Sequence, residues 1–138
     1  MMKKTILALT AVAVFSVAEA KADAGTLRNC ISRTTNDEQA AACYTKENSR
    51  LLKLIQEEYG KIARNSFFKK FNDEQGGNRV QKIYNNWQNY CLEYCSLQAI
   101  SSHFFTYNYN YQLCLYNIYT SKYEDISSIL VNSRTIEE

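Results

Sequence analysis

The chain has 138 residues, a formal net charge of +2, five cysteines and no proline. This length is typical of one domain, and the near-neutral charge argues against the strongly basic surface of a nucleic-acid-binding protein. The absence of proline is compatible with long, uninterrupted helices.

Residues 1–20 have the pattern of a secretory signal peptide. Two lysines near the start precede an apolar run over residues 6–17, and Ala18-Glu19-Ala20 is a small-x-small cleavage site. This run of about twelve residues is shorter than a membrane-spanning helix, which needs about twenty. We therefore expect cleavage after Ala20 and no stable membrane insertion. Residues 21–138 would then form a single periplasmic or secreted domain, with an uncleaved N-terminal anchor as the alternative.

A polar arm precedes the first predicted helix. Residues 21–36 are rich in Thr, Ser and Asn, and Cys30 is positioned to tie this arm to the rest of the domain. Asn36 or Asp37 can cap a helix N-terminus. Over residues 41–62 the apolar side chains recur every three or four positions, which predicts an amphipathic helix of about six turns.

A second long helix is predicted after a chain reversal. Gly60 weakens the first helix locally, although it can continue after a bend as far as Phe71. The polar residues 72–78 include the only glycine pair and predict the reversal. Apolar residues then recur at helical spacing as far as Ile100. They are Val80, Ile83, Tyr84, Trp87, Tyr90, Cys91, Tyr94 and Leu97. We expect the three aromatic residues from Trp87 to Tyr94 to lie in the core.

The segment 101–111 is aromatic and alternates with period two at Tyr107, Tyr109 and Tyr111. Such alternation alone indicates a strand, but no partner strand is evident. We expect an aromatic-rich connection between helices, with a short strand as the alternative. Helical periodicity then returns, and residues 132–138 are predicted to fray. The predicted fold is therefore all-α, an antiparallel bundle of about three long helices tied by disulfides.

Five cysteines in an exported chain allow fifteen arrangements of two disulfides and one thiol. Cys91 and Cys95 are four residues apart on one predicted helix, where their Cβ atoms would be about 5 to 6 Å apart, whereas a disulfide needs about 3.8 Å. Cys30 can reach Cys43, and Cys95 can reach Cys114, through loops of twelve and eighteen intervening residues. We therefore predict these two bonds, each worth about 3 kcal/mol, and a free thiol at Cys91.

The sequence fits two kinds of chemical site poorly, namely a zinc site and a catalytic cysteine–histidine pair. Cys91, Cys95, His103 and Cys114 supply a Cys3His ligand set for zinc, but their spacing fits no common zinc motif and an oxidising compartment favours disulfides. A nucleophile pair of Cys91 and His103 lacks a positioned third group and an oxyanion hole. We therefore predict no metal, no cofactor and no enzymatic activity.

One cluster combines basic and aromatic residues, as a nucleic-acid surface would: Lys61, Arg64, Lys69 and Lys70 with Phe67, Phe68 and Phe71. A solvated helix end with buried phenylalanines explains this cluster equally well. We therefore predict no nucleic-acid partner.

Several of these residues together resemble the LprI-like family of small bacterial envelope proteins, which is named for a lysozyme inhibitor. The family pattern has a cysteine, a second cysteine before a long helix that ends in tyrosine, a Gln-x(3 or 4)-Trp-x-x-Tyr-Arg segment with a further cysteine, and a last cysteine at the start of the final helix. The matching residues are Cys30, then Cys43 with Asn48, Leu51 and Tyr59, then Gln81, Trp87 and Tyr90, then Cys95, and finally Cys114 with Leu115. Gln81 stands one residue further from the tryptophan than is usual in the family. We expect Tyr59, Gln81, Trp87 and Tyr90 to form the core motif of the domain.

Two departures accompany the resemblance. Cys91 occupies the position where the family pattern usually carries arginine, and this chain has no lipid-attachment cysteine after its apolar run, although the family's namesake is a lipoprotein. The resemblance implies an all-helical, disulfide-tied fold and binding to a lysozyme-type hydrolase. The near-neutral charge gives little electrostatic steering toward such enzymes, which are commonly basic.

These observations lead us to expect a non-enzymatic secreted or periplasmic domain that binds a protein partner, with lysozyme inhibition as the function implied by the resemblance. An envelope or immunity-type protein that binds another exported factor is the alternative, and a Cys/His enzyme is the least supported one. Tyr107, Tyr109 and Tyr111 are the candidate binding surface, because exposed tyrosines give contact area at low entropic cost. The alternative is that these rings cover the end of the bundle.

Overall fold

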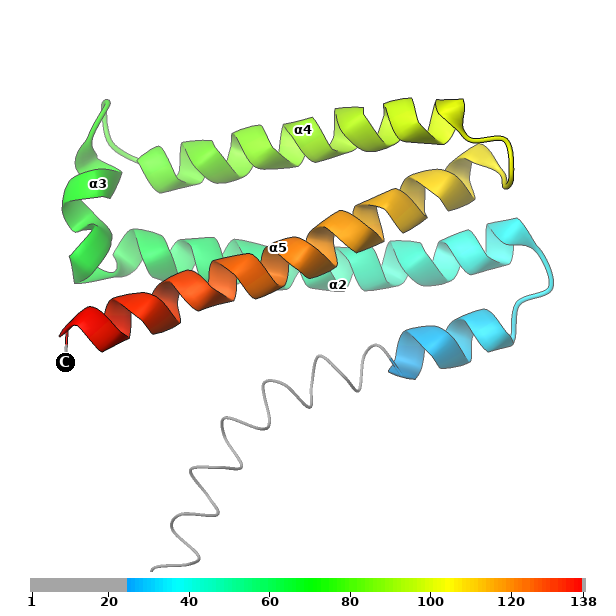
Figure 1. The fold of residues 1–138 in the computed structure, drawn as a ribbon, viewed down its shortest axis with the longest axis horizontal. Coiled ribbons are helices and arrows are strands. Elements are labelled where there is room, and N and C mark those ends of the chain that lie inside the picture. Colours follow the sequence, from blue (N-terminus) through cyan, green and yellow to red (C-terminus); the bar gives the residue numbers. More distant parts are fainter. Residues whose placement is uncertain (1–24, 138) are drawn as a thin grey trace, which may run out of the picture.

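The structure, a computed structural model, describes residues 25–137, with side chains described as far as residue 133. The predicted signal peptide lies outside these residues. Three long helices dominate the fold, namely α2 (Asp37–Arg64), α4 (Arg79–Ser101) and α5 (Tyr107–Glu137). The 3-10 turn η1 (Ser66–Phe68) and the short helix α3 (Lys69–Asp73) join α2 to α4. Figure 1 shows α4 running opposite to α2 and α5, with α3 crossing one end. The all-α bundle predicted from the sequence is therefore confirmed.

Local hydrogen bonds explain where α2 begins and ends. The Gln39 amide donates to the Asn36 side chain at 2.9 Å, and the Gln39 side chain accepts from the Thr35 amide, also at 2.9 Å. This reciprocal arrangement caps the helix at the predicted place. The helix passes through Gly60 and ends at Arg64, because Asn65 is extended and its side chain accepts from the Phe67 amide to start η1.

The predicted reversal lies in the polar loop after α3. Its four residues Gln75, Gly76, Gly77 and Asn78 all have positive φ, between 56° and 86°. Glycine adopts this conformation without steric cost and asparagine tolerates it, so the glycine pair and Asn78 suit the turn. A hydrogen bond across the loop also stabilises the turn: the Asn72 side chain accepts from the Val80 amide at 3.0 Å.

Residues 107–111 are helical, so the prediction of a connection or a short strand there is wrong. The connection covers only residues 102–106, and α5 begins at Tyr107. Thr106 explains the early start: its hydroxyl accepts from the Tyr109 amide at 3.3 Å, and its own amide donates to Asp37 at 3.2 Å. This cap, docked on the start of α2, overrides the period-two pattern. The prediction of a frayed tail is also wrong, since α5 continues to Glu137.

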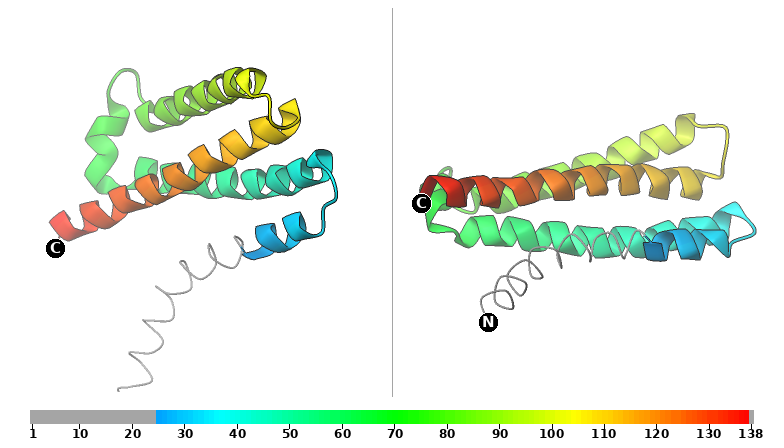
Figure 2. Two further views of the ribbon diagram at one scale, coloured as in Figure 1. Left: turned by 45° about the vertical axis from the view of Figure 1, so that its right-hand side comes forward. Right: turned by 60° about the horizontal axis from the view of Figure 1, so that its bottom comes forward.

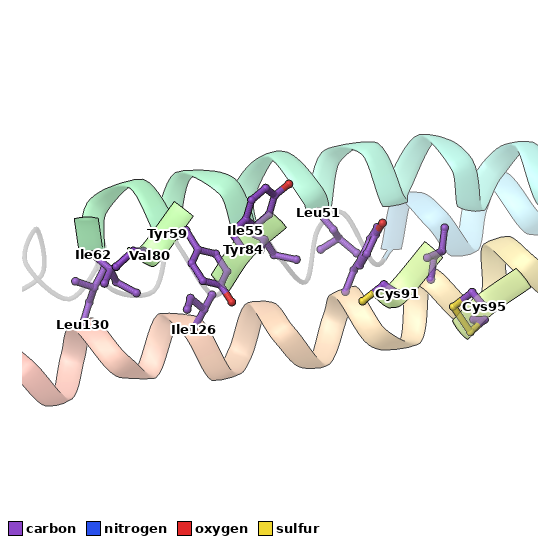
Figure 3. Packing of buried hydrophobic residues seen from close by; sticks show 13 residues of the cluster. Leu51, Ile55, Tyr59, Ile62, Val80, Tyr84, Cys91, Cys95, Ile126 and Leu130 are labelled. Carbon is purple, nitrogen blue, oxygen red and sulfur yellow. A yellow bond between two sulfur atoms is a disulfide. The ribbon is translucent and has the colours of Figure 1, made fainter. Parts of the chain in front are cut away.

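The core runs along the inner faces of α2, α4 and α5 (Figure 3). Its most completely buried large side chains are Ile55, Cys91 and Cys95. The disulfide Cys95–Cys114 joins α4 to α5 inside this core, with a Cα–Cα distance of 5.5 Å. Within residues 25–137, no helix combines the length and the apolar character needed to cross a membrane.

A short helix over residues 25–32 packs beside the first half of α2 (Figure 2). The disulfide Cys30–Cys43 joins the two, with a Cα–Cα distance of 5.9 Å, and Leu27 is buried. The arm is thus tied down by its cysteine, as the sequence predicts, although part of it is helical. Both disulfides are the pairs expected from the spacing of the cysteines.

Candidate functional site

Helix α4 carries two separate apolar faces. Cys91 and Cys95 are fully buried, whereas their neighbours Tyr90 and Tyr94 keep 62% and 41% of their surface exposed. Successive residues of a helix point about 100° apart, and on α4 the cysteine of each adjacent pair faces the core while the tyrosine faces away from it. The expectation that Tyr90 and Tyr94 are core residues is therefore wrong, because the bundle lies on the cysteine side.

The other members of the predicted core motif also differ in burial: Tyr59 and Trp87 lie toward the core, and Gln81 lies in solvent. Tyr59 is buried, with its ring 5.3 Å from that of Tyr84. Trp87 is half-buried, and its ring lies 5.6 Å from that of Tyr119 on α5. Gln81 is exposed and donates to the side chain of Asn85 at 3.0 Å. Gln81 is therefore not a core residue, since it lies on the solvent side of α4.

The outer face of α4, the connection to α5 and the first residue of α5 expose an unusual set of large apolar side chains. We call this set the aromatic surface. Its members and their exposed fractions are Tyr90 62%, Tyr94 41%, Leu97 67%, Ile100 69%, Phe104 90%, Phe105 50% and Tyr107 49%. The helical members follow one another at spacings of three or four residues, so they continue along one side of α4 toward the chain connection. Figure 1 shows α4 along one edge of the bundle.

Ring contacts hold several of these side chains in place. Tyr90 and Tyr94 stack, with ring centroids 5.7 Å apart and planes 14° apart. Phe105 packs on Tyr109 at 4.6 Å, and Tyr107 stacks on Tyr111 at 6.0 Å. Aromatic side chains fixed in this way lose little entropy on binding, which favours their use as contact residues. The aromatic surface is thus both exposed and partly preorganised.

The three tyrosines proposed from the sequence as a binding surface do not act as one group. Tyr107 is exposed and belongs to the aromatic surface, whereas Tyr109 and Tyr111 are half-buried. Tyr109 meets the ring of Tyr44 edge-on at 5.8 Å. Burial raises the pKa of Tyr111, as expected for a phenol packed against the bundle. Two of the three rings therefore cover the bundle's end, as the alternative interpretation has it.

Sequence reasoning missed six members of the aromatic surface, although a signal was present. Apolar residues are adjacent at several places on α4, among them Ile83 with Tyr84, Tyr90 with Cys91, and Tyr94 with Cys95. In each of these three pairs the structure buries only the second residue. Because Cys95 bonds to the next helix, Cys95 and Cys91 mark the inner face, and Tyr90 and Tyr94 then point outward.

Cys91 has a thiol that the fold shields. Its exposed fraction is 0%, and burial raises its pKa, an effect that the positive charge of Lys122 offsets only in part. His103 is exposed in the connection after α4, and the end of α4 at Ser101 already lies about 15 Å from Cys91 along the axis at the helical rise of 1.5 Å per residue. The geometry therefore does not bring the two residues of the suggested nucleophile pair together.

The suggested zinc ligands do not come together as a site. Cys95 and Cys114 form a disulfide with each other, and Cys91 is buried in the core, whereas His103 is exposed. Among the described residues, no cluster of three or more His, Cys, Asp or Glu side chains is placed to hold a metal ion. In the basic cluster considered for nucleic acid, Lys61 and Lys69 each pair with a carboxylate at 3.0 Å.

Comparisons of this chain with protein-family models, with characterised proteins and with solved structures find no match. The resemblance to the LprI-like family therefore stays a prediction from the sequence.

Proposed function

We propose that the protein is a non-enzymatic exported domain that binds another protein through the aromatic surface. The observation that supports this most strongly is the exposure of seven large apolar side chains on the outer face of α4, in the connection beside it and at the start of α5. Scattered single apolar residues on a surface need no explanation, whereas a contiguous exposed patch is typical of an interaction site. Tyrosine and phenylalanine are also enriched at the centres of protein interfaces.

A lysozyme-type hydrolase is the partner that we propose first, on the strength of the sequence resemblance. The test uses the exported protein with both disulfides formed, mixed with several lysozymes of different classes in a cell-wall lysis assay. Inhibition at a micromolar excess would support the proposal. If none of the enzymes is slowed, the inhibitor function is rejected for that panel.

The role of the aromatic surface is tested on whichever enzyme binds. The double variant Tyr94→Gln/Leu97→Gln should weaken binding by about 30-fold or more, because loss of interface hot spots costs about 2 kcal/mol or more. Ile129→Gln is a matched control, since Ile129 is also an exposed apolar residue, with 40% of its surface exposed, but lies on α5 outside the aromatic surface. If the double variant and Ile129→Gln lose the same amount of binding affinity, the partner binds outside the aromatic surface.

The environment of Cys91 supports the non-enzymatic part of the proposal. A nucleophilic cysteine is partly exposed and has a lowered pKa, whereas Cys91 is buried and its pKa is raised. A thiol reagent should therefore label Cys91 only after the protein is unfolded in denaturant. Rapid labelling of the native protein would favour a reactive role and count against our proposal.

A further inference from the structure

A second apolar feature lies at the opposite end of the bundle, where α3 crosses from α2 to α4. A pocket of about 380 Å³ opens there, and we call it the end pocket. All five described elements from α2 to α5 contribute to its lining. Small-molecule sites typically measure about 300–1,000 Å³ and have mostly apolar walls with a few polar groups. The volume of the end pocket is near the lower limit of this range, which favours a small or single-chain ligand.

The walls of the end pocket are apolar from the base to the rim. Ile62, Val80 and Ile126 are buried at its base, and Figure 3 shows their side chains gathered at this end of the core. At the rim, Ile83 and Ile129 keep 42% and 40% of their surfaces exposed. An apolar chain lying in the pocket would cover surface that is now in contact with water, which is a favourable change.

Lys122 places a positive charge at this apolar pocket. The side chain lines the pocket, and its Nζ lies 5.2 Å from the centre of the Trp87 ring. Among the described residues, Lys122 has no carboxylate within ion-pair distance, whereas the nearby Arg79 pairs with Glu74 at 2.7 Å and covers the ring of Phe71. For this half-buried pair, the cation–π contact with Trp87 is worth about 1–2 kcal/mol, less than a charge-assisted hydrogen bond to an anionic group can supply. Lys122 can therefore leave the ring for an anionic ligand at small cost.

We propose that the end pocket binds a single-chain amphiphile with an anionic head group, whose alkyl tail lies against the apolar walls and whose head pairs with Lys122. One group opposes this arrangement: the carboxylate of Asp125, one turn further along α5, also lines the pocket. Asp125 is exposed, so water screens its repulsion more than it screens the attraction of the half-buried Lys122. The proposal is independent of the protein partner proposed above, because the end pocket and the aromatic surface share no residue.

The test is a titration of the oxidised exported protein with tetradecanoate below its micelle concentration. Trp87 is the only tryptophan, so its fluorescence should change saturably as Lys122 moves from the ring to the ligand. Dodecanoate should bind about 10-fold more weakly, because each buried methylene contributes about 0.8 kcal/mol. Tetradecyltrimethylammonium has the same tail and the opposite charge, and it should bind at least about 10-fold more weakly than tetradecanoate.

Variants separate the end pocket from general adhesion of a surfactant. By calorimetry, Lys122→Met should weaken tetradecanoate binding about 10-fold, and Asp125→Asn should tighten it. Ile129→Gln should weaken binding, whereas Ile100→Gln, which changes an exposed apolar residue of the aromatic surface, should leave it unchanged. No saturable binding by the wild-type protein would overturn the proposal. Equal binding of both head groups, or a larger effect of Ile100→Gln than of Ile129→Gln, would also overturn it.

Discussion

The inner and outer faces of α4 use similar residues for different purposes. On the inner face, Tyr84 is buried against Tyr59 and its hydroxyl accepts from the Gln56 side chain at 2.7 Å, while Cys95 is bonded to α5. On the outer face, Tyr90 and Tyr94 have ring contacts only with each other among the described residues. Both faces repeat at helical spacing. The orientation relative to α2 and α5, rather than residue type, decides which tyrosine stabilises the fold.

This difference has a functional consequence. A ring that is already packed in the core cannot contact a partner without unfolding, whereas a ring in water can be buried by binding. The outer face therefore carries apolar surface that folding does not use. The end pocket also has apolar surface that folding leaves in contact with water, since Ile83 and Ile129 remain partly exposed at its rim.

The comparison of the two faces is tested most directly with one tyrosine from each. Tyr84→Ala should lower the free energy of unfolding by about 3–5 kcal/mol, because it leaves a cavity and removes the partner of Gln56. Tyr90→Ala should cost less than about 1 kcal/mol, since it removes only one exposed stack. Urea unfolding followed by circular dichroism measures both. Comparable losses would mean that the outer face is packed against something in solution, such as a second copy of the chain.

The two disulfides extend the comparison from side chains to cross-links. Loss of the core bond in Cys95→Ala/Cys114→Ala should lower the free energy of unfolding by about 3 kcal/mol. Loss of the arm bond in Cys30→Ala/Cys43→Ala should cost about 1 kcal/mol, less than the roughly 3 kcal/mol that loop length alone predicts, because the arm can detach without opening the core. The same urea titrations decide this order. A larger effect at the arm would show that residues 25–36 are integral to the cooperative unit.

Much of the fold could be predicted because its signals are local. The cap at Asn36 and the reversal at Gly76 and Gly77 depend on neighbouring residues, and both lie where the sequence predicts them. The disulfide pairs follow from reach along the chain. The helical start at Tyr107 was missed although Thr106 is a local cap signal, because the period-two alternation of Tyr107, Tyr109 and Tyr111 was given more weight. The docking of Thr106 on Asp37, 69 residues earlier in the chain, could not be predicted from local signals.

The candidate site was harder to predict for a related reason. Periodicity shows that α4 has apolar faces, but Tyr90 and Cys91 belong to two interleaved sets with the same spacing. Periodicity does not distinguish the two sets, whereas the bond of Cys95 to Cys114 marks the set that faces α5. The end pocket is harder still, since its walls come from α2, η1, α3, α4 and α5 together.

Substitutions of Cys91 test whether the inner face of α4 excludes water and polar groups. Cys91→Ser should lower the free energy of unfolding by about 1–3 kcal/mol, because a hydroxyl is buried there without a designed partner. Cys91→Ala should cost about 1 kcal/mol, since it only removes packing atoms. Urea unfolding under identical conditions gives the difference between them. If serine is tolerated better than alanine, a polar partner is available and the inner face is less apolar than the structure indicates.

The smallest predicted effect is a pH dependence that comes from the inner face. Burial raises the pKa of Cys91 above 9.0, and it also raises the pKa of Tyr59 and Tyr84 above 10.0. Each group is then neutral in the folded protein but ionises in the unfolded chain at its ordinary pKa. The unfolded state therefore loses more protons as the pH rises, so stability is complete at neutral pH and decreases in alkaline solution.

As the pH rises, Cys91 should be the first of the three groups to lower the free energy of unfolding, because its ordinary pKa is the lowest. Between pH 8 and pH 9.5 it should account for a loss of up to about 0.8 kcal/mol, which is the free energy of ionising an unfolded thiol half a unit above its pKa. Cys91→Ala removes this component but keeps the later loss above pH 10, which comes from the tyrosines. Urea midpoints at pH 8, 9.5 and 10.5 for both proteins supply the measurement. Parallel profiles for the wild type and Cys91→Ala between pH 8 and pH 9.5 would show that the thiol ionises as readily in the folded state, and hence that water reaches the inner face of α4.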